Sequence, residues 1–233
     1  MALSATARRA LDAYGGADRW RAASRVRLVL SAHGLAFRLK WQPPLSRVRQ
    51  VLEIREPRVR CEGIDRAGHV GVLDGHDVRL ETPDGAPVAT RPGARAFFGP
   101  GRRWFYWDSL DQAYFACYAA WNYFTLPALL LRDDVSWTEV EAGVLEGRFP
   151  PALPTHCALQ RFTFSTASGL LFRHDYAPDI ISPLARASRI VVAHGSHDGV
   201  PFPRLMRITP RAAGAVLPGP LLVSVEAHAF EME

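Results

Sequence analysis

The spacing of apolar and polar residues changes along the chain, and each change marks a different kind of predicted element. Residues 5–23 have apolar positions at helical spacing, interrupted by Gly15-Gly16, so a short N-terminal helical hairpin is expected within residues 1–23. From Arg25 the period becomes two, first in Arg25 to Leu28 and again from Phe37 to Trp41. This alternation is typical of strands that have one face in the core and one in water.

Residues 25–82 are predicted to continue as a meander of about six short antiparallel strands. Turn-forming pairs such as Pro43-Pro44 and Asp74-Gly75 separate the alternating segments. The expected strands, besides the two alternating segments above, are 46–54, 58–64, 70–73 and 78–81. Arginine at alternate positions keeps one face of this sheet in water.

The segment from Asp108 to Leu131 (residues 108–131) shows a third pattern, with apolar residues on every side. Asp108 suits the cap of a helix and Asp111 its first turn. A helix that is apolar all round is normally buried. The run approaches the length of a membrane span, but Asn122 and Pro127 interrupt it, so a buried core helix is favoured and no stable membrane insertion is expected. Pro127 should break or kink the helix.

Alternation returns after Val135, and residues 135–230 are predicted to form the second strand-rich half. Ser168-Gly169 and Asp198-Gly199 are expected hairpin turns. No repeat or linker separates the two halves, so one domain over residues 1–233 is expected. The expected strands of this half are Leu159 to Phe164, Leu170 to Tyr176, Arg189 to Ala193, Leu205 to Ile208 and Leu221 to His228.

Composition and charge narrow the function classes. The chain has 233 residues, of which 48% are hydrophobic and 22% charged, enough for a sizeable core. The net charge of +5 comes from arginines spread along the chain, and no nucleic-acid-binding motif accompanies them, so no nucleic-acid partner is expected. Met1 to Arg9 lacks the apolar run of a secretory signal, which predicts a cytoplasmic protein.

Motifs for cofactors and metals are missing from the sequence. It has no phosphate-binding loop, no dinucleotide fingerprint and no nucleophile elbow, so no cofactor is expected. The three cysteines are far apart and indicate neither disulfides nor a zinc site. His194, His197 and Asp198 lack a further ligand at suitable spacing, so no metal site is predicted.

Four short stretches resemble the LolA-like half-barrel superfamily. They are residues 169–176 (Gly-Leu-Leu-Phe-Arg-His-Asp-Tyr), residues 197–208 with Asp-Gly-Val-Pro-Phe-Pro, residues 14–20 and residues 118–123. The resemblance implies a mainly β (α+β) fold, in which a single curved antiparallel sheet forms a half-barrel around the aromatic helix. It also implies an apolar ligand, because the superfamily includes lipoprotein carriers and a VioE-type cofactor-free enzyme of pigment biosynthesis. Fold alone does not decide between carrying and catalysis.

Candidate site residues lie on the helix and on one strand. Asp111, Tyr114, Tyr118 and Asn122 share one side of the helix by their spacing and could line a small-molecule pocket. The alternative is that these aromatic side chains only fill the core. On the strand from Leu170 to Tyr176, the face of Leu170, Phe172, His174 and Tyr176 is expected to point inward. A core histidine bonded to a carbonyl is the alternative for His174.

Two functional hypotheses follow. The first is a cofactor-independent cyclase or isomerase of secondary metabolism, acting on a hydrophobic small molecule. In it, His174 would move a proton, Asp111 would assist, and Tyr114 and Tyr176 would hydrogen-bond developing charge. The second is a non-catalytic carrier or binding protein for a lipid or other hydrophobic ligand. The expected ligand-binding residues are Trp41, Trp104, Phe115, Tyr118, Trp121 and Asn122.

Overall fold

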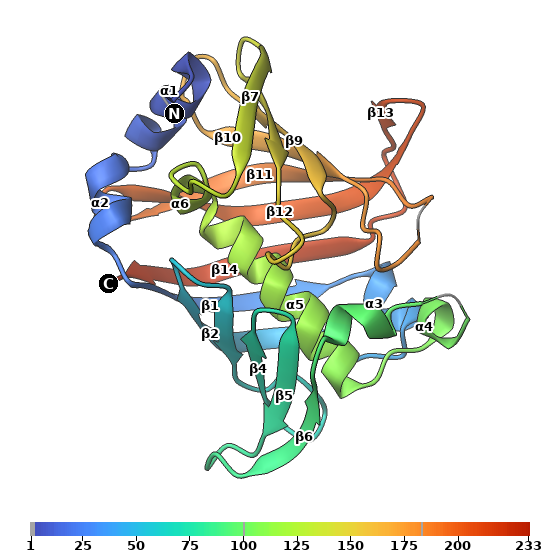
Figure 1. The fold of residues 1–233 in the computed structure, drawn as a ribbon. Helices are drawn as coiled ribbons and strands as arrows, with labels where there is room; N and C mark the ends of the chain where they lie inside the picture. Colours follow the sequence, from blue (N-terminus) through green and yellow to red (C-terminus); the bar gives the residue numbers. More distant parts are fainter. Residues whose placement is uncertain (1–2, 100, 183) are drawn as a thin grey trace.

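The computed structural model describes residues 3–99, 101–182 and 184–233. The first two residues of the N-terminal segment, on which the cytoplasmic prediction depends, therefore lie outside the described residues. These described residues form one antiparallel sheet of 14 strands that wraps around a central helix (Figure 1). The first six strands are β1 (Arg25–His33), β2 (Leu45–Glu53), β3 (Arg58–Cys61), β4 (Val70–Asp74), β5 (Asp77–Glu81) and β6 (Pro87–Arg91). The others are β7 (Ser136–Glu141), β8 (Val144–Arg148), β9 (Leu159–Phe164), β10 (Leu171–Tyr176), β11 (Ala187–His197), β12 (Val200–Ala212), β13 (Ala215–Val216) and β14 (Val223–Met232).

The C-terminal strand joins the two halves of the sheet. The strand order is β6-β5-β4-β3-β2-β1-β14-β12-β11-β10-β9-β8-β7, with the short β13 beside β12. β14 pairs with β1 on one side and with β12 on the other, so its backbone groups are satisfied from both halves. The sheet is not closed, because β6 and β7 remain at its two ends. This architecture confirms the predicted curved antiparallel half-barrel.

The central helix α5 (Ser109–Phe124) lies inside the curve of the sheet and packs against β3, β4 and β5 (Figure 1). Asp108 and Asp111 form a reciprocal capping box at its start, each side chain accepting a hydrogen bond from the other's backbone N–H. The helix ends at Phe124, and Pro127 lies in the first turn of the short α6 (Leu126–Leu129). The buried helix and its break near Pro127 are therefore confirmed.

In the part of the chain that the structure describes, four other α-helices and one 3₁₀ helix lie around this core. α1 (Ala5–Ala13) and α2 (Ala17–Ala22) form the predicted N-terminal hairpin, with Gly15 and Gly16 between them at positive φ. α3 (Leu35–Leu39), the 3₁₀ helix η1 (Ala94–Phe97) and α4 (Arg102–Phe105) lie near the N-terminal end of α5. Among the described residues, no helix is long and apolar enough to cross a membrane.

The strand predicted from Phe37 to Trp41 is wrong. These residues belong to α3 and the turn after it, where Trp41 adopts φ +60°. Gly34 allows the chain to leave β1, since a Cβ there would lie 2.4 Å from the carbonyl oxygen of Leu222. The amides of residues 35 and 36 then donate to the carbonyls of residues 221 and 222. This contact with a distant segment overrides the local alternation.

The inward face predicted for β10 is correct for His174 and Tyr176 but wrong for Phe172. A bulge between Leu171 and Arg173 shifts the register against β9, so Leu171 is buried and Phe172 is half exposed. Four strands lie outside the predicted set: β6, β7, β8 and the two-residue β13. β6 and β7 have few buried positions and lie at the two ends of the sheet, so their sequences carry little apolar signal, and β8 lies next to β7.

Candidate functional site

A large cavity of about 560 Å³ lies between one face of α5 and the concave side of the sheet. β1, β2, β12 and β14 supply one wall, and α3, α4 and residues 178–181 and 184–187 supply the others. Most of the lining side chains are aliphatic or aromatic. A volume of this size is within the range of about 300–1,000 Å³ that is usual for small-molecule sites.

Small residues on α5 create this space. Ala116, Ala119 and Ala120 line the cavity at helical spacing, and Phe115 and Tyr123 flank them on the same side. A larger side chain at any of the three alanines would project into the cavity, because it would extend from the helix toward the sheet. The cavity therefore depends on residues whose contribution is the volume they leave empty.

Polar groups interrupt the apolar wall in three places. Near α3 they are Lys40, Gln42, Gln50 and Gln112, and burial lowers the pKa of Lys40 to about 8. The Lys40 ammonium donates to the carbonyl of Trp104, which fixes it at the wall. Further along α5, the hydroxyls of Tyr123 and Tyr176 hydrogen-bond to each other (O···O 2.8 Å) on the cavity wall. The third place is formed by Arg186 and Arg211, where the amide of Arg211 donates to the carbonyl of Arg186 (2.9 Å).

Behind this tyrosine pair lies a cluster of buried aromatic polar groups. His156 shares hydrogen bonds with Tyr118 (3.2 Å) and Tyr123 (3.1 Å), and its ring stacks on Tyr176 at 3.9 Å. His174 shares a hydrogen bond with the side-chain oxygen of Gln160 (2.7 Å). Burial, reinforced by nearby positive charge, lowers the pKa of both histidines well below 6.5, so both are neutral at pH 7.

Arg189 of β11 supplies that positive charge. Its side chain is fully buried, and its guanidinium carbon lies 4.0 Å from the centroid of the Tyr123 ring. Its Nε and Nη2 atoms have no hydrogen-bond partner among the described residues, and Nη1 reaches only the sulfur of Met206 at 3.8 Å. Burial lowers the pKa of Arg189. Neutral tyrosines and histidines therefore surround a buried cation, which is an environment that opposes protonation of either histidine.

Most of the predicted catalytic residues lie away from the cavity. Asp111 is fully buried and bonds to Arg91 (2.6 Å) as well as forming the capping box. Tyr114 shares a hydrogen bond with His76 (2.8 Å) on the side of α5 opposite the alanines. His174 lies in the core beyond the cavity wall. Of the four, only Tyr176 lines the cavity.

The predicted ligand-binding residues divide in the same way. Phe115 and Trp104 line the cavity, whereas Trp41 lies on the surface with 72% of its area exposed. Tyr118, Trp121 and Asn122 are buried on other sides of α5. Trp121 donates to the carbonyl of Glu53 (2.8 Å), and Asn122 donates to the carbonyls of Tyr118 (2.7 Å) and Pro154 (2.8 Å). The Trp121 and Asn122 side chains therefore satisfy backbone carbonyls, and the Tyr118 hydroxyl hydrogen-bonds to His156 instead.

The sequence reasoning missed the three alanines that form the cavity floor. Their spacing at positions 116, 119 and 120 was visible, as was the contrast with the bulky residues at 114, 118 and 121. That contrast was the available signal, since small side chains on a helix that is otherwise aromatic leave space beside it. Among the described residues, no group of three or more histidine, cysteine or carboxylate side chains could hold a metal ion.

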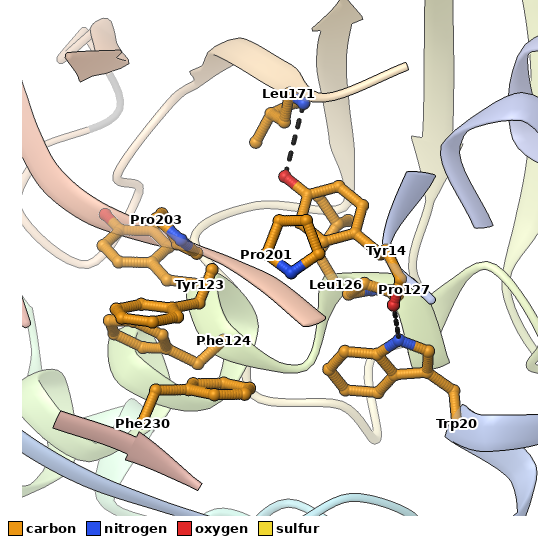
Figure 2. A pocket seen from close by; sticks show the side chains of 11 residues that line it. Tyr14, Trp20, Tyr123, Phe124, Leu126, Pro127, Leu171, Pro201, Pro203 and Phe230 are labelled. Carbon is orange, nitrogen blue, oxygen red and sulfur yellow. Dashed lines mark hydrogen bonds between the residues drawn. The ribbon is translucent and has the colours of Figure 1, made fainter. Parts of the chain in front are cut away.

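A second, much smaller cavity of about 10 Å³ lies near the C-terminal end of α5 (Figure 2). Tyr14 and Trp20 from the N-terminal hairpin meet Tyr123 and Phe124 there, and the Tyr14 hydroxyl accepts a hydrogen bond from the amide of Leu171 (3.3 Å). This space is no larger than about one water molecule requires. It is a packing contact between the hairpin and the core, so the larger cavity is the candidate site.

Comparisons with known proteins find similarity in structure only. No family model and no curated protein sequence matches the chain. A LolA superfamily protein from Nitrosomonas europaea superposes with a TM-score of 0.54 at 7% identity, covering 100% of this chain and 94% of that one. A DUF1329 family protein from Desulfovibrio piger gives 0.51 at 12% identity, covering 98% and 92%. The chain has a LolA-like fold.

A third solved structure with this LolA-like fold comes from Vibrio parahaemolyticus and is named as an outer membrane lipoprotein-sorting protein domain. It has a TM-score of 0.51 and 11% identity, and the match covers 98% of this chain and 91% of that one. All three matches extend over almost the whole chain, so the LolA-like fold includes both halves of the sheet and the helix between them.

Proposed function

We propose that this protein binds a hydrophobic small molecule, such as a lipid, in the cavity beside α5 and acts as a carrier or binding protein. The observation that carries the proposal is the cavity of about 560 Å³ with an almost wholly apolar lining. An unfilled apolar space of this size costs a folded protein stability, because the atoms around it lose packing contacts. A bound apolar ligand restores those contacts.

The LolA-like fold supports this proposal. The relative from Vibrio parahaemolyticus is named for lipoprotein sorting, and a cavity suited to an acyl chain is in keeping with that name. The polar groups at the wall, Lys40 and the Tyr123–Tyr176 pair, could meet a ligand's polar end while the rest of the ligand contacts aliphatic side chains.

A cofactor-independent cyclase or isomerase is the less favoured alternative. It requires His174 to exchange a proton with the ligand, but His174 is buried in the core, neutral, and bonded to Gln160. A general acid or base has to reach the reacting atom at about 2.6–3.2 Å or through one water. Among its proposed catalytic residues, only Tyr176 faces the cavity. Binding without chemistry therefore fits the geometry better.

The first experiment identifies what the protein carries. Native mass spectrometry of gently purified protein, followed by solvent extraction, should reveal acyl lipids or another apolar molecule. A titration with cis-parinaric acid, a fluorescent fatty acid, then measures affinity for the cavity. Absence of both a co-purified apolar molecule and saturable probe binding would contradict the proposal.

A cavity-filling variant localises the binding. Ala120→Phe places a ring in the cavity and should weaken probe binding at least about tenfold, since the ligand and the new side chain compete for the same volume. The matched control is Val192→Phe, at an exposed position on β11 away from the cavity. Equal affinities for the two variants would place the probe elsewhere.

A further inference from the structure

Large apolar side chains are exposed around the mouth of the cavity. We call Leu39, Trp41, Trp104, Phe105 and Leu184 the mouth rim. The exposed fraction is 72% for Trp41, 69% for Phe105 and 86% for Leu184. Soluble proteins seldom gather such residues on one side of the surface without a partner for them.

The mouth rim is continuous with the cavity. Leu39, Trp104 and Leu184 contribute to its lining although each is exposed at the surface, so they mark where the cavity meets the outside. Backbone and side-chain hydrogen bonds hold the neighbouring segments together. The Lys40 ammonium donates to the carbonyl of Trp104, and the amide of Trp107 donates to the carbonyl of Lys40 (3.2 Å). Figure 1 shows α3 and α4 on the same side of the molecule.

The segments that carry the mouth rim are basic. Arg38 and Arg186 are exposed beside it. Residues 35–52 and 97–107 contain no aspartate or glutamate. The segment that carries Leu184 has one carboxylate, Asp179, and its charge is balanced by an ion pair with Arg95 (N···O 2.5 Å). The surface around the mouth therefore combines aromatic and leucine side chains with a positive charge.

We propose that the mouth rim docks on the surface of an anionic lipid bilayer, so that an apolar ligand passes between the bilayer and the cavity without crossing water. Tryptophan and other aromatic side chains favour the boundary between lipid headgroups and acyl chains. Arginines beside them are attracted to anionic headgroups. The proposal rests on ligand binding in the cavity, and it names the membrane surface as the place where the ligand enters and leaves.

Vesicle co-sedimentation tests the docking. The wild-type chain should bind vesicles of phosphatidylglycerol and phosphatidylcholine, bind vesicles of phosphatidylcholine alone more weakly, and lose affinity as salt is raised. The double variant Trp41→Ser, Phe105→Ser should bind the anionic vesicles at least about tenfold more weakly, because both apolar anchors are lost. The matched control is Phe172→Ser, Val192→Ser, which removes two exposed apolar side chains from β10 and β11.

A charge reversal tests the electrostatic part separately. Arg38→Glu should weaken binding to the anionic vesicles about fivefold or more and flatten the salt dependence. Arg207→Glu, at an exposed position on β12, is the control and should have little effect. Equal losses in Arg38→Glu and Arg207→Glu would mean that only net charge matters, which overturns a docking site at the mouth.

The two proposals fail in distinguishable ways. Neither Trp41 nor Phe105 lines the cavity, so their double variant should keep its affinity for cis-parinaric acid in the absence of vesicles. Ala120→Phe should show the reverse, with vesicle binding kept and probe binding lost. Wild-type protein that binds the probe but no anionic vesicle overturns docking alone. Self-association that the Trp41→Ser, Phe105→Ser variant abolishes would assign the mouth rim to a second copy of the chain and also overturn it.

Discussion

The two sides of helix α5 differ in what their residues do. One side carries the polar side chains Asp111, Tyr114 and Asn122. Each of them is buried and hydrogen-bonded to another part of the protein. The other side carries alanines and borders the large cavity. Polar groups on a buried helix are therefore poor markers of a site here, because burial itself obliges them to find partners.

The largest expected effect that separates the two sides is on stability. Asp111→Ala removes a buried carboxylate from Arg91 and half of the capping box, and should lower the free energy of unfolding by about 3 kcal/mol. Urea denaturation measures the change. Glu141→Ala, which breaks an exposed ion pair with Arg161, is the control and should change stability little.

Affinity for cis-parinaric acid should stay within about twofold in folded Asp111→Ala protein, because Asp111 lies away from the cavity. Loss of a direct contact with the ligand would change the affinity by more than about twofold. A large loss of affinity with unchanged stability would instead make the polar side of α5 part of the binding site.

A second expected effect is the pH dependence of stability. The pKa of His156 and of His174 is lowered in the folded protein, so the unfolded chain takes up protons that the folded chain does not as pH falls below 6.5. The free energy of unfolding should therefore decrease as the pH is lowered below 6.5, by up to about 1.4 kcal/mol per pH unit for each histidine.

The variant His174→Phe should reduce this dependence of the free energy of unfolding on pH by up to about 1.4 kcal/mol per pH unit, because the phenyl ring does not titrate. Denaturation midpoints between pH 7 and pH 5 provide the measurement, with the exposed His228→Phe as the control. An unchanged pH dependence in His174→Phe would mean that His174 takes up a proton in the folded protein as readily as in the unfolded chain. It would then be able to act as a proton donor.

The smallest expected effect compares two hydroxyls on opposite sides of α5. Tyr114→Phe and Tyr123→Phe each remove hydrogen bonds of a buried hydroxyl and should each cost about 1 kcal/mol of stability. Only Tyr123→Phe should alter the affinity for cis-parinaric acid, because only Tyr123 lines the cavity. An altered affinity in Tyr114→Phe alone would reverse the assignment of the two sides.

Several elements follow directly from local sequence patterns. The alternation in β1 and β9, the capping signal at Asp108 and the break near Pro127 each depend on near neighbours in the chain, so they could be predicted. The inward direction of His174 was also predicted, yet the bulge in β10 was not. A bulge depends on how the partner strand pairs, and a single strand's sequence does not contain that information.

The sequence by itself determined the mainly β architecture, the buried helix and the supply of aromatic and small residues from which a cavity is made. Only the tertiary structure decided which side of α5 faces the cavity. Apolar residues surround this helix, so its sequence carries no strong preference for one side, and the choice falls to contacts with Arg91, His76 and Pro154 from other elements. Likewise α3 replaces a predicted strand because the segment at residues 221 and 222 binds its first amides. Long-range partners of buried polar groups decide such questions, because leaving those groups unpaired costs more than local propensity contributes.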